Sequence, residues 1–124
     1  MMRSNALLAA AFFLVLTGCD NSISHEYRQE RSEKNYQLGI EEFNAGNIDK
    51  AIAYLSQAIK LSPGNASARF QLAVIQQESK KDYLGALCNF AEYVRIAERS
   101  DKAQIANERV VNCKRLLLSA MALE

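Results

Sequence analysis

The chain has 124 residues, of which 49% are apolar, five are glycine and one is proline, a composition that argues against a disordered or low-complexity protein. Its 15 basic and 14 acidic residues nearly balance, which argues against a nucleic-acid partner and against a polybasic membrane patch. The length suits about one small domain after removal of an N-terminal leader.

Residues 1–18 have the pattern of a secretory leader. Arg3 gives a positive start, and Ala6 to Leu16 is an apolar run of eleven residues, whereas a helix that spans a bilayer needs roughly 20. The segment Leu16-Thr17-Gly18-Cys19 follows and resembles a bacterial lipobox. This resemblance implies cleavage before Cys19, lipid attachment to its sulfur and acylation of its new amine. An ordinary secretory signal followed by a chance cysteine is the alternative.

The lipobox resemblance predicts a location for the mature chain. Two or three acyl chains, such as palmitate, would hold residues 19–124 firmly on a membrane, outside the cytoplasm and facing the periplasm. Asp20 looks like the inner-membrane retention signal of enterobacterial lipoproteins, and Asn21 fits that pattern. We therefore expect a lipid-anchored protein of the cell envelope, with the inner membrane favoured.

A first pair of helices is predicted behind a short polar tether. Residues 19–31 should form the tether and the start of a helix that runs from about Ser24 to Ala45 and ends at Gly46. Asn47 is the expected cap of the second helix. Its apolar stripe consists of Ile48, Ala51, Ile52, Leu55, Ala58, Ile59 and Leu61, before the turn Ser62-Pro63-Gly64.

Three more helices are predicted after this turn. The first has Asn65 as its cap and ends near Ser79, and the turn Lys80-Lys81-Asp82 leads to the next, which continues to about Ala97. Ser100 or Asp101 should cap the last helix, which reaches Ala122. Because no segment alternates apolar and polar residues, we predict an all-α fold of antiparallel helices with short loops.

The spacing of small and large residues in 32–65 resembles one tetratricopeptide repeat (TPR). The matching residues are Leu38, Gly39, Gly46, Ala51, Leu55, Ala58 and Pro63. In this family two antiparallel helices approach closely where small side chains lie. Glu42 departs from the pattern, which usually has an aromatic residue there, and the neighbouring Phe43 could take that role.

Residues 66–99 resemble a second, degenerate TPR. Its matching residues are Leu72, Ala73, Ala86 and Phe90, but the turn has one extra residue, Tyr93 replaces a small residue and no proline closes the unit. Residues 100–124 would then be a capping helix. The resemblance implies TPR-like helical hairpins that form a fragment of a right-handed α-solenoid.

The resemblance also implies a partner-binding groove lined by the first helix of each repeat. The corresponding residues are Tyr36, Ile40, Phe43, Asn44, Phe70, Val74 and Gln77. An aromatic and aliphatic groove suits an apolar peptide or an amphipathic helix. The alternative is that the N-terminal helix or Tyr27 simply buries these residues.

Cys88 and Cys113 are a possible disulfide. Their midpoint in the sequence lies at the loop near Ser100, so antiparallel helices could bring the two sulfurs to the same level. Such a bond would stabilise the fold by roughly 3 kcal/mol. The alternative is two reduced thiols, with Cys88 pointing away because it lies beside the apolar stripe rather than within it.

Residues that could carry catalysis or bind a metal do not form a recognisable pattern. The single histidine, His25, has no partner at metal-binding spacing. We expect no catalytic residues, cofactor, metal, nucleic-acid partner or small-molecule substrate. The predicted function is a membrane-anchored scaffold or assembly factor that binds another envelope protein. The alternatives are a structural subunit of a secretion, pilus or cell-wall complex, with the stripe of the last helix as its interface, and a small envelope enzyme.

Overall fold

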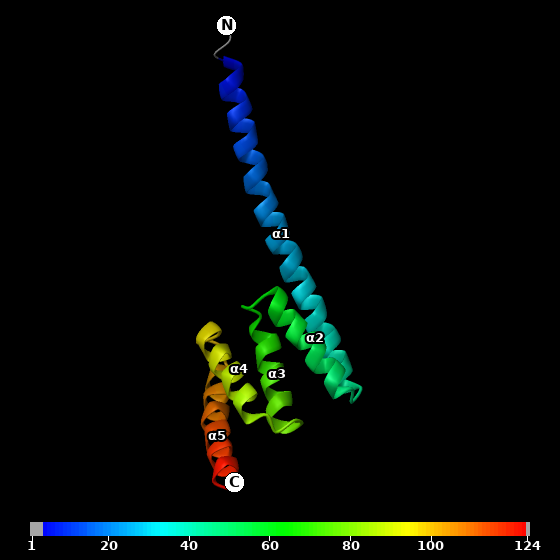
Figure 1. Ribbon diagram of the computed structural model, residues 1–124, viewed down its shortest axis with the longest axis vertical. Coiled ribbons are helices and arrows are strands. Elements are labelled where there is room, and N and C mark those ends of the chain that lie inside the picture. Colours follow the sequence, from blue (N-terminus) through cyan, green and yellow to red (C-terminus); the bar gives the residue numbers. More distant parts are fainter. Residues whose placement is uncertain (1–3, 124) are drawn as a thin grey trace.

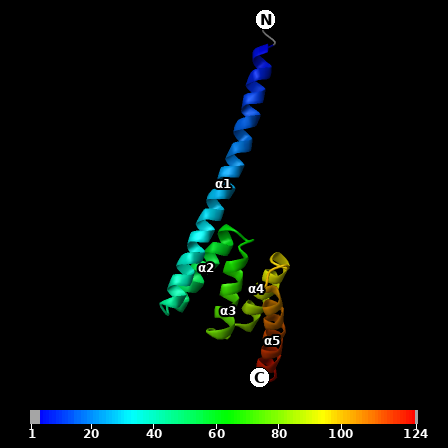
Figure 2. The same cartoon turned by 180° about the vertical axis from the view of Figure 1, so that it is seen from behind.

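The computed structural model describes residues 4–123, with side chains described from Ser24 to Leu123. All regular elements within these residues are helices: α1 (Ser4–Asn44), α2 (Ile48–Leu61), α3 (Ala66–Glu78), α4 (Tyr83–Ile96) and α5 (Ala103–Ala122). Helix α2 packs against the C-terminal half of α1, and α3, α4 and α5 follow on one side of that pair (Figures 1 and 2). The prediction of an all-α fold built from adjacent hairpins is confirmed.

Helix α1 begins earlier than we expected. It starts at Ser4 rather than near Ser24, so it includes the segment for which we expected a polar tether. The physical reason is local: no proline interrupts Ser4–Asn44, and its N-terminal half is rich in alanine and leucine, which favour helices. In the part of the chain that the structure describes, no helix is long and apolar enough to cross a membrane.

The turns follow the chemistry of their residues. Gly46 has a φ of +82°, the left-handed conformation expected after α1. The side chain of Asn65 accepts a hydrogen bond of 3.0 Å from the backbone N–H of Ala68, which confirms its predicted role as a cap. Asp82 caps α4 in the same way, through the N–H of Gly85 at 2.9 Å.

Two predicted caps are wrong. Asn47 lies at the N-cap position of α2, but its side chain makes no capping hydrogen bond, and its amide N–H donates to Glu42 Oε2 at 2.7 Å. Helix α5 begins after Lys102, so neither Ser100 nor Asp101 caps it. The hydroxyl of Ser100 bonds that of Tyr93 at 2.9 Å, a tertiary contact that competes with the local one.

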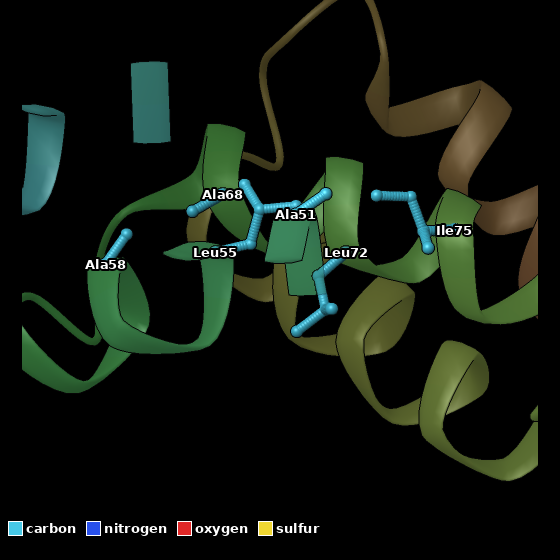
Figure 3. Packing of buried hydrophobic residues seen from close by; sticks show 6 residues of the cluster. All are labelled: Ala51, Leu55, Ala58, Ala68, Leu72 and Ile75. Atoms are coloured by element: carbon cyan, nitrogen blue, oxygen red, sulfur yellow. The ribbon is translucent and has the colours of Figure 1, made fainter. Parts of the chain in front are cut away.

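The core consists of two clusters that meet at α3. The first cluster contains Ala51, Leu55 and Ala58 of α2 with Ala68, Leu72 and Ile75 of α3, shown in Figure 3. The second cluster joins Ala73 of α3 to residues of α4 and α5, namely Ala86, Phe90, Tyr93, Ala106 and Cys113. Helix α3 therefore has two buried faces, one toward α2 and one toward α4 and α5.

Small residues set the distance between α1 and α2. A Cβ atom built on Gly39 would lie 2.8 Å from Cγ of Leu55, a side chain with no exposed surface. Real Cβ atoms essentially never come so close. The glycine is therefore required by packing, as its position in the TPR pattern indicates.

Ser32 joins the first three helices. Its buried hydroxyl donates to the carbonyl oxygen of Ala58 in α2 at 2.7 Å and accepts from Asn65 Nδ2, at the start of α3, at 2.9 Å. Asn65 thus caps α3 and holds it to α1 at the same time. Because these groups lie away from water, each depends on the others for its hydrogen bonds.

Gly39→Val should destabilise the protein by about 1–3 kcal/mol, because the added side chain must displace Leu55 in a packed interface. Urea unfolding followed by circular dichroism measures this change. Gly64→Val is the matched control, since a Cβ there meets nothing within 4 Å. Equal stabilities of the two variants would contradict the close approach of α1 and α2.

Ser32→Ala should cost about 1–3 kcal/mol, because it leaves the Asn65 amide group without its acceptor. Ser56→Ala, at an exposed position of α2, should leave the unfolding midpoint almost unchanged. If Ser32→Ala unfolds at the same urea concentration as Ser56→Ala, the three-helix junction contributes nothing to stability.

Candidate protein-binding site

The large residues of the predicted groove are divided between the two core clusters. Tyr36 and Phe43 of α1 pack against the first cluster, whereas Phe70 and Val74 of α3 pack against the second. Burial, followed by the nearby charge of Glu33, raises the pKa of Tyr36 above its usual value. These four side chains therefore contribute to the core as well as to the surface.

Helices α4 and α5 cover the second half of the predicted groove. The ring of Phe70 packs edge-on against Phe90 and Tyr93, with centroids 5.6 and 5.1 Å apart, and the ammonium of Lys102 lies 5.3 Å from its centroid. Gln77 is buried and accepts a hydrogen bond of 2.9 Å from Arg109 of α5. The prediction that Gln77 faces an open groove is therefore wrong.

The helix that contacts Gln77 is α5, whereas the alternative that we considered was burial by the N-terminal helix or by Tyr27. Arg109 of α5 reaches both Gln77 and the exposed Glu78, the latter at 2.8 Å. The N-terminal helix does not make these contacts. Of the predicted set, Ile40 remains half-buried on α1 and Asn44 is exposed.

Two open hollows lie side by side along α1 and α2. They have volumes of about 480 and 440 Å³ and share Asn35 and Tyr54 in their walls. The first also contains Tyr27 and Leu38, and the second contains Lys50 and Glu42. No sequence signal marks Tyr54 as a surface residue of interest, because its position in α2 lies beside the apolar stripe.

A third hollow lies where α1 passes the turn between α2 and α3. It has a volume of about 520 Å³, and its walls include His25 and Arg28 of α1 and Pro63 of the turn. The guanidinium of Arg28 donates to the carbonyl oxygen of Leu61 at 3.2 Å, so it is occupied in holding the end of α2.

The two cysteines of the α4–α5 hairpin are free thiols. Cys88 is exposed on α4, whereas Cys113 is fully buried in the second cluster. The pairing suggested by their positions around the loop is not formed, because the Cys88 side chain lies outside the core that holds Cys113. Burial raises the pKa of the Cys113 thiol, against a smaller lowering effect of Arg109.

The largest exposed apolar groups gather on α5. Val111, Leu118 and Met121 are 67%, 66% and 62% exposed and recur at spacings of seven and three residues, which places them on one side of the helix. Lys114 and Arg115 lie between them in the sequence and are exposed. We call these five residues the outer face of α5. The sequence pattern indicated a broad apolar stripe here but did not separate its buried from its exposed part.

Within residues 24–123, no group of three His, Cys, Asp or Glu side chains is placed to hold a metal ion. Several ionisable side chains form ion pairs at the surface. Lys80 pairs with Asp49, for example, and Glu92 pairs with Arg95, which lowers the pKa of that carboxyl.

Comparison with known families identifies part of the fold. Residues 43–82 match the tetratricopeptide repeat family. This segment contains α2 and α3, the second helix of the first predicted repeat and the first helix of the second. The chain therefore carries a tetratricopeptide repeat, usually a non-catalytic module that binds other proteins. No curated protein matches the chain.

Cys88 should react with iodoacetamide at pH 8 in the native protein, whereas Cys113 should react only after denaturation. Its burial blocks access and raises its pKa, which lowers the fraction of reactive thiolate. Mass spectrometry of peptides after labelling with and without urea measures both rates. Equal rates in the native state would contradict the placement of Cys113, and a lack of reaction at both before reduction would indicate a disulfide.

Proposed function

We propose that this protein is a lipid-anchored scaffold of the bacterial cell envelope, which holds another envelope protein through its TPR-type helices. The observation that carries the proposal is the repeat itself: α2 and α3 match the family, and the core of the described chain is built from hairpins of the same kind. Stacked hairpins offer a large, rigid surface for contact with a partner.

The anchor is the second part of the proposal. An apolar run follows Arg3 and leads directly to the lipobox-like segment that ends in Cys19. Two or three acyl chains on Cys19 would give stable membrane attachment, whereas one chain gives only transient binding. Asp20 supports retention at the inner membrane, with the folded helices in the periplasm.

A permanent subunit of a larger assembly is the second candidate. It is favoured by the apolar residues of the outer face of α5, since an exposed patch of this kind marks an interface. The two candidates differ in whether the full-length chain, extracted in detergent, exists as a monomer. A monomer supports a scaffold that recruits its partner, and an obligate complex supports the subunit.

Expression of the full-length chain in a bacterium should give a product that begins at Cys19 and carries two or three acyl chains. Intact-mass measurement of the membrane fraction checks both features. Cys19→Ser should abolish the added mass and move the chain out of the lipoprotein fraction, because it removes the sulfur that accepts the lipid.

Cys88→Ser is the matched control and should keep the acylated mass, since Cys88 lies on α4 within the folded part. If Cys19→Ser retains the same mass and membrane attachment as the unaltered chain, the anchor is not a lipid on Cys19. The result is independent of which helix binds the partner.

A further inference from the structure

Helix α3 shows how an inner helix of this array uses two faces. Ala68 belongs to the first cluster, and Ala73, five positions later, belongs to the second. Five positions along an α-helix turn the direction of a side chain by about 140°. Leu72 and Gln77 repeat the relation, since Leu72 faces the first cluster and Gln77 meets α5.

Helix α5 has the same two faces, but only one of them is covered. Ala106 and Cys113 are buried against the preceding helices. Five positions after each of them come Val111 and Leu118, which are 67% and 66% exposed. They lie in the direction in which α3 presents Ala73 to the following helices. The outer face of α5 is thus the place where the next helix of an array would pack.

The charges along the apolar part of this face are basic, and one acidic residue, the exposed Glu108, lies three positions before its first apolar residue, Val111. Lys114 and Arg115 are the only charged residues between Val111 and Leu123, and both are exposed. Lys114 lies three positions after Val111 and four before Leu118, and Arg115 has the reverse spacing, so the two flank the apolar pair on either side. Neither takes part in an ion pair within the described residues.

We propose that the outer face of α5 binds an amphipathic helix of a partner protein, with an apolar stripe flanked by Asp or Glu residues. This inference deepens the proposed function and rests on it, since it names the surface and the chemistry of the partner. The apolar pair supplies the buried contact, and the basic flanks select acidic neighbours and fix the register.

The charges argue against a second copy of this chain as the occupant. Two outer faces packed together would bring Lys114 and Arg115 of both copies to the middle of one interface, where like charges repel. The position argues against a membrane. Cys19 belongs to α1, and in Figures 1 and 2 the start of α1 and the C-terminal end of α5 are at opposite ends of the long axis of the molecule.

A library of displayed helical peptides, selected on the full-length chain in detergent, tests the proposal. The selected peptides should have apolar residues at spacings of three, four and seven, with Asp or Glu on both flanks. Leu118→Ser should weaken their binding about tenfold or more, as expected for an anchor residue at the centre of an interface. The variant K114E/R115E should instead select peptides with basic flanks.

Two control variants outside α5 test whether binding of the peptides depends on the outer face of α5. Leu84→Ser removes a leucine of similar exposure, 58%, from α4, and K60E/K81E reverses two exposed lysines outside α5. Both should bind the selected peptides like the unaltered chain, and circular dichroism should show that all variants are folded. Binding that is insensitive to Leu118→Ser, equally sensitive to Leu84→Ser, or without preference for acidic flanks would overturn the proposal.

Two further experiments test whether a second copy of the chain or a lipid bilayer occupies the outer face of α5 instead. Self-association in detergent that Leu118→Ser abolishes would assign the face to a second copy and overturn the proposal. A polarity-sensitive dye on Leu118→Cys, in a Cys88→Ser background, that enters the bilayer of anionic liposomes would assign it to lipid, with the same consequence. A failed peptide selection leaves the Cys19 mass measurement unaffected, so failure of this inference and failure of the anchor can be told apart.

Discussion

The need to bury two faces of each inner helix governs this structure. Helix α3 is too short to be stable alone, and it is held because Leu72 and Ile75 face one hairpin while Ala73 and Phe70 face the other. The first and last of the described helices, α1 and α5, pack against other helices on one side only. Whatever apolar surface they keep on the free side must meet water or another molecule. The exposed residues of α5 lie on a side where none of the described helices packs.

Close approach of the backbones makes such burial possible with few large side chains. Ala51, Ala58, Ala68 and Ala73 have no exposed surface, and Gly39 leaves room for Leu55. Helices α3 and α4 pack together through a large side chain instead. Tyr93 replaces the small residue of the family pattern, and its ring fills space beside Phe70 while its hydroxyl reaches Ser100. In the segment where we predicted a degenerate repeat, an aromatic contact thus takes the place of a close backbone approach.

The sequence predicted the local features of the fold well and the long-range polar contacts poorly. The bounds of α2 and the cap at Asn65 follow from periodicity and from a side chain that acts within three residues of its own position. The contact between Arg109 and Gln77 joins residues 32 positions apart and has no local signature. For this reason the family positions predicted a groove, but the sequence did not predict that α5 would cover Gln77. The exposure of Cys88 agrees with the alternative drawn from its place beside the apolar stripe, whereas a midpoint at the loop fixes the level of a residue but not its direction around the helix.

The continuous α1 bears on how an anchored form of this protein would work. In the state that we propose, cleavage before Cys19 leaves residues 19–31 ahead of the first repeat, and these residues are helical as part of α1. A helix of this length extends about 20 Å and is stiff, whereas a flexible tether would let the folded part turn freely above the membrane. Arg28 strengthens the connection, because its bond to Leu61 joins the helix to the end of α2. In the anchored state that we propose, a stiff stalk would direct the far end of the helices away from the bilayer, toward the space where a partner with an acidic helix would be met.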